Sequence, residues 1–221
     1  MTDQIPMPLP INDNRSLKIE NFKERLKKRE IWINGNIDDS LIELLYASLI
    51  DLEQQSPVLP ITVAINSNGG LFYESIVATD LMGTMSCPVK TIALANVCSG
   101  GFIIFMGGKE RIAHDNTCLM MHSVGFGMSD KLPDIEDRLE YTKQAQSKMA
   151  KFLASQTGGR TTPEYWLSIF KSGKEKWFPI EEALELGIVH KIIKRPEMVD
   201  PDFSIRKPYM WDIVDIARSQ Q

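Results

Sequence analysis

Residues 91–108 read TIALANVCSGGFIIFMGG, an uncharged stretch in which Ser99 stands between a predicted strand and a predicted buried helix. A serine at a glycine-flanked turn from strand to helix either caps the helix or is a nucleophile. In the second case its side chain is exposed and the next backbone N–H faces the attacked carbonyl. A second apolar run, at residues 119–121, ends in His122, a candidate general base. This stretch alone leaves both uses of Ser99 open.

The composition limits the class of protein. A chain of 221 residues, 43% of them hydrophobic, is long enough to form one core, so we expect one domain. The net charge is −4 and no long basic run is present, which gives no support for nucleic-acid binding or for an anionic membrane surface.

The cysteines and histidines indicate a reduced protein without a metal site. The three cysteines are odd in number and lie in apolar surroundings, as is typical of small core residues in a cytosolic protein. The three histidines are not at ligand spacing from one another or from cysteine, so no metal site is expected. No signal peptide and no spanning helix are predicted. We therefore expect a soluble, cytoplasmic protein.

The order of predicted elements is typical of an α/β protein. The predicted strands are at residues 30–35, 60–66, 89–94, 111–113 and 118–122, with a last one after Gly187. Helices are predicted at residues 41–52, between 70 and 85, at 99–106 and within 179–186. Alternating strands and helices predict parallel crossover units stacked on one another.

A long helix is predicted beyond His122. One stripe holds Leu132, Ile135, Leu139, Thr142, Gln146, Met149 and Leu153. More than twenty residues is long for a helix of a small domain. The helix is either an ordinary amphipathic cover or a projecting element that buries its stripe against another subunit.

Four motifs resemble those of the ClpP family of caseinolytic serine peptidases, in the same order. INSNGG (65–70) resembles the family's Ile-Asn-Ser-Pro-Gly-Gly, and CSGG (98–101) stands where the family has Ala-Ser-Met-Gly. LMMH (119–122) resembles the strand that ends in the catalytic histidine, and EEALELGIV (181–189) the family's Glu-Ala-x-x-x-Gly-Leu-Ile/Val.

The resemblance implies a fold, with domain bounds. The fold class is α/β, built of ClpP/crotonase-like stacked β-β-α crossover units with a projecting long helix. The peptidase domain is expected at residues 16–194, between a flexible N-terminal arm (1–15) and a C-terminal tail (195–221).

The resemblance also implies a function. It is that of a serine endopeptidase that hydrolyses unfolded polypeptides or peptides inside homo-oligomeric rings, fed by an AAA+ unfoldase (a Clp ATPase). Ser99 is the expected nucleophile and His122 the base, while the N–H groups of Gly69 and Gly100 are the expected oxyanion donors. No cofactor is expected. The chain has no Gly-Lys-Ser/Thr phosphate loop, so any use of ATP would belong to a partner.

The third member of the catalytic triad is where the sequence departs from the family. Counting back from Trp177, the family's aspartate position falls on Lys171, which cannot hold an imidazolium. Glu175 is the nearest carboxylate and is our expected triad acid, with Ser172 as a weaker acceptor and a merely solvated Glu175 as the alternative. The competing function is therefore a catalytically weak or inactive ring subunit with a structural or regulatory role. An acyl-CoA enzyme of the related crotonase fold is disfavoured, because such enzymes need no serine at this turn.

Overall fold

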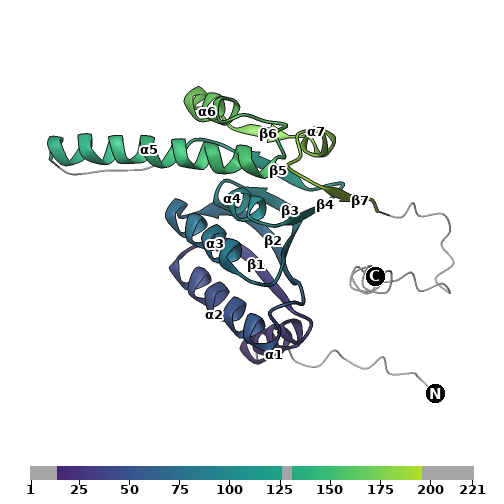
Figure 1. Cartoon of the computed structure of the whole chain (residues 1–221). Coiled ribbons are helices and arrows are strands. Elements are labelled where there is room, and N and C mark those ends of the chain that lie inside the picture. The colour runs from purple at the N-terminus through teal and green to yellow at the C-terminus, as the bar shows by residue number, and fades with distance from the viewer. Residues whose placement is uncertain (1–13, 126–130, 196–221) are drawn as a thin grey trace, which may run out of the picture.

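The computed structural model describes residues 14–125 and 131–195 (Figure 1). Its strands are β1 (Glu30–Ile37), β2 (Ile61–Gly70), β3 (Val89–Cys98), β4 (Glu110–His114), β5 (Cys118–Met121), β6 (Lys176–Phe178) and β7 (Lys191–Ile193). Its helices are α1 (Asn14–Lys27), α2 (Asp39–Gln55), α3 (Phe72–Thr84), α4 (Gly100–Met106), α5 (Leu132–Gln156), α6 (Pro163–Ser172) and α7 (Ile180–Glu185).

The strands form a seven-stranded sheet in the order β1-β2-β3-β4-β7, and β5 pairs with both β3 and β6. All pairs are parallel except β5 with β6. Strands β1, β2 and β3 follow one another in both sequence and space, and helices α2 and α3 make the two connections between them. These are the crossover units that the sequence predicts, and the α/β fold of the ClpP/crotonase type is confirmed.

Local sequence explains where the first of these helices begins. Asp38 is the N-cap of α2, and its carboxylate accepts a hydrogen bond from the N–H of Leu41 at 2.9 Å. A capping carboxylate satisfies one of the N–H groups that have no partner inside the helix. The apolar stripe of α2 then faces the core through buried residues such as Leu45, Leu49 and Leu52.

Helix α4 is buried on all sides. Every one of its seven residues is buried, and residues 102–106 are at most 2% exposed. A helix that is apolar all round lies inside a protein rather than on its surface. Helix α4 contacts β2, β3, α3 and α5, so its first residue is held in a fixed place at the end of β3.

Helix α5 is long and only partly covered. It has 25 residues, and its N-terminal end extends beyond the rest of the described fold (Figure 1). Its C-terminal half buries residues such as Met149 and Leu153, whereas Leu132 and Leu139 in the N-terminal half are 68% and 41% exposed. Within the described residues, the predicted stripe is therefore covered along only half of its length.

Helices α1 and α6 and the exposure of Cys118 differ from what the sequence predicts. Neither α1 nor α6 was predicted, because residues 16–28 are of mixed charge and the ten residues of α6 form a short segment. Trp177 is 50% exposed, whereas its neighbour Phe178 is buried. Cys118 is exposed, whereas Cys87 and Cys98 lie in the core as expected.

The predicted arm and tail fall mainly outside the described residues. Of the arm (1–15), only residues 14 and 15 are described, and they open helix α1. Of the tail (195–221), only Arg195 is described. Within 14–125 and 131–195, no helix combines the length and hydropathy needed to cross a bilayer. The same residues hold no group of three or more histidine, cysteine, aspartate or glutamate side chains that could bind a metal ion.

Candidate active site

Ser99 occupies a strained turn between β3 and α4. It is the N-cap residue of α4, with φ 53° and ψ −119°, and its side chain makes no capping hydrogen bond. Positive φ is uncommon in residues other than glycine and costs about 1–3 kcal/mol. Its N–H donates to the carbonyl of Met120 at 2.9 Å, and its carbonyl accepts from the N–H of Ile103 at 3.1 Å. The backbone is held on both sides, and the half-buried hydroxyl is turned away from the helix end.

His122 meets Ser99 directly. Its Nε2 lies 2.8 Å from Ser99 Oγ, although the two residues are 23 positions apart in sequence. The contact arises because β5 pairs with the end of β3, where Cys98 is opposite Met120. Ser99 directly follows the last residue of β3, and His122 directly follows the last residue of β5, so both side chains lie where these two adjacent strands end. The sequence left two uses of Ser99 open. The structure shows no capping hydrogen bond from the Ser99 side chain, and it places the hydroxyl next to an imidazole.

The strand pairing is irregular near this site. The register shifts between Asn34 and Asn36 in β1 and again between Ile65 and Ser67 in β2. Asn66 lies at the second shift, where its Nδ2 donates to Asn34 Oδ1 at 2.7 Å and its Oδ1 accepts from the N–H of Asn96 at 3.3 Å. The amide of Asn66 thus joins three neighbouring strands where their ladders are interrupted. This role was not anticipated, although an asparagine near the end of each of three strands was a usable signal.

The glycine turn after β2 packs against Ser99. A Cβ added at Gly69 would lie 2.7 Å from the Cβ of Ser99 and 3.0 Å from the nitrogen of Gly100. Gly69 also has φ +110°, which side chains rarely allow. The turn from Gly69 to Gly70 and the start of α4 are therefore in direct contact, and only glycine permits that approach.

The N–H of Gly69 is already engaged in this structure. It donates to Ser67 Oγ at 3.1 Å, and Ser67 is only 2% exposed. Gly70 lies beside the other expected donor, because its nitrogen would be 3.4 Å from a Cβ added at Gly100. Gly100 opens helix α4, so its N–H has no acceptor within the helix. Ser67 and Gly70 belong to the turn but were not expected to have a role.

Glu175 and His122 are each one residue beyond the last pair of the β5–β6 ladder. Met121 is paired with Lys176, and extending this antiparallel register by one residue places His122 against Glu175. Side chains in directly opposed positions have Cβ atoms about 4.5–5.5 Å apart. The carboxylate of Glu175 is exposed and accepts a hydrogen bond from Trp177 Nε1 at 3.1 Å. In the described residues the carboxylate of Glu175 is bonded to Trp177, and no hydrogen bond or ion pair joins it to His122.

The other two residues considered for the acid position are turned elsewhere. Lys171 is exposed near the end of α6. Ser172 Oγ donates to the carbonyl of Ile169 at 2.7 Å and accepts from the N–H of Lys174 at 3.1 Å. The hydroxyl of Ser172 therefore stabilises the end of its own helix.

An aromatic cluster ties β6 to the helix that begins after Ser99. The ring centroids of Phe102 and Phe178 are 5.5 Å apart, and Trp166 lies 5.9 Å from the first and 5.8 Å from the second. The indole Nε1 of Trp166 donates to Thr161 Oγ1 at 2.8 Å. This cluster fixes the strand that carries Glu175 relative to α4.

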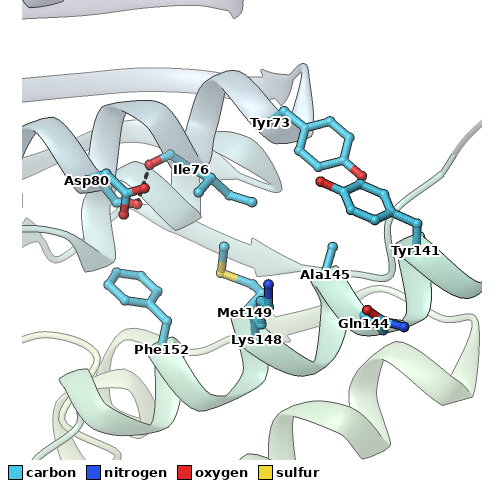
Figure 2. Close-up of a pocket in the computed structure, with 10 residues that line it drawn as sticks. Tyr73, Ile76, Asp80, Tyr141, Gln144, Ala145, Lys148, Met149 and Phe152 are labelled. Atoms are coloured by element: carbon cyan, nitrogen blue, oxygen red, sulfur yellow. Dashed lines mark hydrogen bonds between the residues drawn. The ribbon is translucent and has the colours of Figure 1, made fainter.

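An apolar groove lies between α3 and α5. Its volume is about 390 Å³, and Ile76, Met149 and Phe152 line it (Figure 2). Tyr73 and Tyr141 face each other across the two helices at one end, with ring centroids 5.9 Å apart (Figure 2). Because α3 begins two residues after Gly70, this groove leads away from the glycine turn.

Cys98 shares the surroundings of the site without the reactivity of a thiolate. Burial raises the pKa of its thiol, and the charges of Cys118 and Glu175 add to the rise. A thiol with a raised pKa stays protonated and is a poor nucleophile near neutral pH. Ser99 is therefore the better candidate of the two adjacent residues.

Comparisons with known proteins agree with this geometry. The family profile described as Clp protease matches residues 13–196. A protein of Corynebacterium diphtheriae named ATP-dependent Clp protease proteolytic subunit 2 is 28% identical over 197 residues, which cover 88% of this chain and 96% of the relative. The protein of the same name from Corynebacterium efficiens is 28% identical over 200 residues, covering 89% of this chain and 98% of the relative.

Gly69→Ala tests the contact between the glycine turn and Ser99, and Gly35→Ala is its matched control. Both glycines have nearly the same positive φ, +110° and +107°, but a Cβ at Gly35 would meet nothing within 4 Å. Both variants should lose about 1 kcal/mol of stability from backbone strain. Only Gly69→Ala should also displace Ser99 and lower kcat/KM by more than about 100-fold, the size expected when an oxyanion site is disturbed. Equal activity in the two variants, measured with a short fluorogenic peptide, would contradict this account.

Proposed function

Because the chain belongs to the Clp protease family, we propose that it is an active serine endopeptidase in which Ser99 is the nucleophile and His122 the general base. The observation that carries this proposal is the 2.8 Å contact between His122 Nε2 and Ser99 Oγ. A serine hydroxyl is a weak nucleophile at neutral pH unless a neighbouring base takes its proton. The strained backbone of Ser99 supports the same role, because strain of this kind gathers at sites where a side chain must be presented.

The reaction follows from these positions. Ser99 Oγ attacks the carbonyl carbon of the scissile peptide bond while His122 Nε2 takes the hydroxyl proton. The C–N bond then breaks, and His122 returns that proton to the leaving amine, leaving an acyl ester on Ser99. A water molecule, deprotonated by His122 in the same way, hydrolyses the ester and restores the serine.

The negative oxygen of each tetrahedral intermediate needs N–H donors. Gly100 N–H is one, because it directly follows the nucleophile and has no acceptor inside its helix. The second comes from the glycine turn. Gly69 serves if its N–H leaves Ser67 Oγ, and Gly70 serves through the N–H that lies beside Gly100. The first arrangement requires the peptide group between Asn68 and Gly69 to rotate, whereas the second requires no such rotation.

Glu175 is the proposed partner of His122 on the side away from Ser99. Its position opposite His122 in the extended β5–β6 register supports the assignment. A carboxylate there would hold the imidazole in the correct tautomer and stabilise the imidazolium that forms during the reaction. To do so Glu175 must turn from Trp177 Nε1, with which it now shares a hydrogen bond of 3.1 Å.

The substrates and the assembly follow the family. We propose unfolded polypeptides or peptides as substrates, homo-oligomeric rings that enclose the sites, and delivery by an AAA+ unfoldase of the Clp ATPase type in the cytoplasm. The names of the two relatives, proteolytic subunits of an ATP-dependent protease, support a separate ATPase partner. The exposed half of α5, with Leu132 and Leu139, supplies a surface for another subunit.

One second function is favoured by specific observations. Lys171 stands at the family's aspartate position, and Ser67 occupies the Gly69 N–H. Both fit a ring subunit that keeps the fold and assembles but cleaves slowly or not at all. The experiments below separate the two functions.

The first experiment identifies the acylated residue. A fluorophosphonate probe should label the wild-type chain at Ser99, as shown by peptide mapping. Ser99→Ala should abolish labelling while the circular dichroism spectrum stays unchanged, because the methyl group fills nearly the same space. Persistent labelling of that variant, or adducts at Ser67 or Ser123, would show that Ser99 is not the nucleophile.

The second experiment addresses the triad acid. If Glu175 orients His122, Glu175→Gln should lower kcat by up to about 10⁴-fold, as loss of a triad acid does elsewhere. Glu181→Gln, another exposed glutamate, is the control and should change little. Lys171→Asp should raise kcat if the end of α6 can reach the imidazole. An unchanged kcat in Glu175→Gln would show that Glu175 does not orient His122.

The third experiment measures assembly. The chain has a mass of 25.0 kDa, and light scattering at micromolar concentration should give several times that value. Leu132→Glu with Leu139→Glu should reduce the mass, because burying two carboxylates in an apolar interface is costly. Lys143→Glu on the same helix is the exposed control. A monomer in the wild-type protein would leave α5 as a cover helix only.

A further inference from the structure

A second hollow lies at the other end of the long helix, away from Ser99. It has a volume of about 430 Å³ and is formed by the start of β4, the C-terminal end of α5 and the turn between α7 and β7. Four of its lining residues are basic or imidazole side chains, namely Lys109, Arg111, Arg160 and His190. No carboxylate is among the lining residues in the described part of the chain.

Arg111 is the buried basic residue that lines this hollow. Its side chain is 2% exposed, which makes it one of the largest fully buried side chains of the fold. The guanidinium donates to the carbonyls of Gly108, Gln156, Gly187 and Ile188 at 2.6–2.9 Å. All four acceptors are neutral, and no ion pair reaches Arg111 from the residues that the structure describes. Burial lowers the pKa of Arg111 to about 10.

A buried positive charge without a counter-ion is unusual, because desolvation of a charge is expensive unless an opposite charge accompanies it. The partial negative charge at the C-terminal end of α5 offsets only about half an elementary charge. Lys109 and Arg160 add two further positive charges at the exposed rim. Glu110, whose charge acts on His190, is already paired with Lys90 at 3.2 Å.

The surroundings of His190 also show an excess of positive charge in this hollow. Both ring nitrogens face donors of Arg111: Nδ1 is 3.1 Å from the backbone nitrogen and Nε2 is 2.8 Å from Nη2. A neutral imidazole has only one accepting nitrogen, so one of these contacts places two donors against each other. The pKa of His190 is lowered by burial and then by the charge of Arg111, with a smaller lowering from Arg160 and an opposing rise from Glu110.

We propose that this hollow binds a small tetrahedral oxyanion, either inorganic phosphate or the phosphoryl group of a phosphomonoester. The oxyanion would accept hydrogen bonds from Lys109 and Arg160 at the rim and supply the missing negative charge above Arg111. Charge-assisted bonds from lysine and arginine are the usual means of phosphate recognition.

Isothermal titration calorimetry on the full chain tests the proposal, with potassium chloride used to hold ionic strength constant. Inorganic phosphate and phosphoserine are titrated separately. If inorganic phosphate binds saturably and phosphoserine does not, the site is specific for the free ion. If phosphoserine binds equally well, the site also accepts a phosphomonoester. Lys109→Gln with Arg160→Gln should weaken binding at least tenfold. Lys23→Gln with Lys143→Gln removes the same charge from exposed positions elsewhere and should leave binding within twofold of wild type.

The pH dependence is measured with sulfate, whose charge is constant between pH 6 and 8. Sulfate binding should change less than twofold between pH 7.5 and pH 6, because an imidazolium at His190 would set both ring N–H groups against donors of Arg111. Heats no larger than those of chloride would overturn the proposal, and so would equal binding by the two double variants. Arg111→Gln is left out of the test, because it would remove hydrogen bonds to four backbone carbonyls and disturb the fold itself.

Discussion

The site depends on a single constraint, the complete burial of helix α4. All seven of its residues are inside the fold, and Phe102, Ile103, Ile104 and Phe105 pack between the sheet and its neighbouring helices. Burial of each such side chain contributes about 1.5–3 kcal/mol, so the four together outweigh the ~1–3 kcal/mol of backbone strain at Ser99. The helix cannot shift to relieve that strain without exposing its apolar side chains. The position of the nucleophile is thus a consequence of core packing rather than of any contact made by its own hydroxyl.

The order of elements could be predicted because strands and helices each leave a local pattern. Residues 61–65 are a continuous apolar and β-branched run, and α2 shows a helical stripe with a capping aspartate before it. The contact of Ser99 with His122 was expected only from motif order, but the reason for it is the pairing of β5 with the end of β3. The place of Glu175 opposite His122 in the extended β5–β6 register could not be derived from spacing. It depends on an antiparallel pairing between residues 119–121 and 176–178, which no local pattern specifies.

The glycine turn shows a second limit of sequence reasoning. A motif identifies which residues meet, but it does not say which N–H groups are free. The hydroxyl of Ser67 takes the Gly69 N–H in the structure, a bond between neutral groups worth about 1 kcal/mol. An oxyanion is a charged acceptor, and hydrogen bonds to charged groups are roughly twice as strong. The developing negative charge can therefore compete with Ser67 for this donor, whereas an uncharged substrate carbonyl has no such advantage.

By an ungapped count Lys171 stands at the family's aspartate position, and we expect this replacement to change the rate more than the kind of chemistry. Glu175 is exposed and held by Trp177, and an exposed charge beside an imidazole gains at most about 1 kcal/mol from direct attraction. Any larger effect must come from fixing the tautomer and orientation of His122, which depends on geometry rather than on charge alone. Even without an acid, oxyanion donors and substrate binding retain about 10³–10⁴-fold catalysis over water. A Clp protease chain with Ser99, His122 and the glycine turn in contact therefore keeps a route to peptide hydrolysis, and the partner of His122 sets how fast that route is.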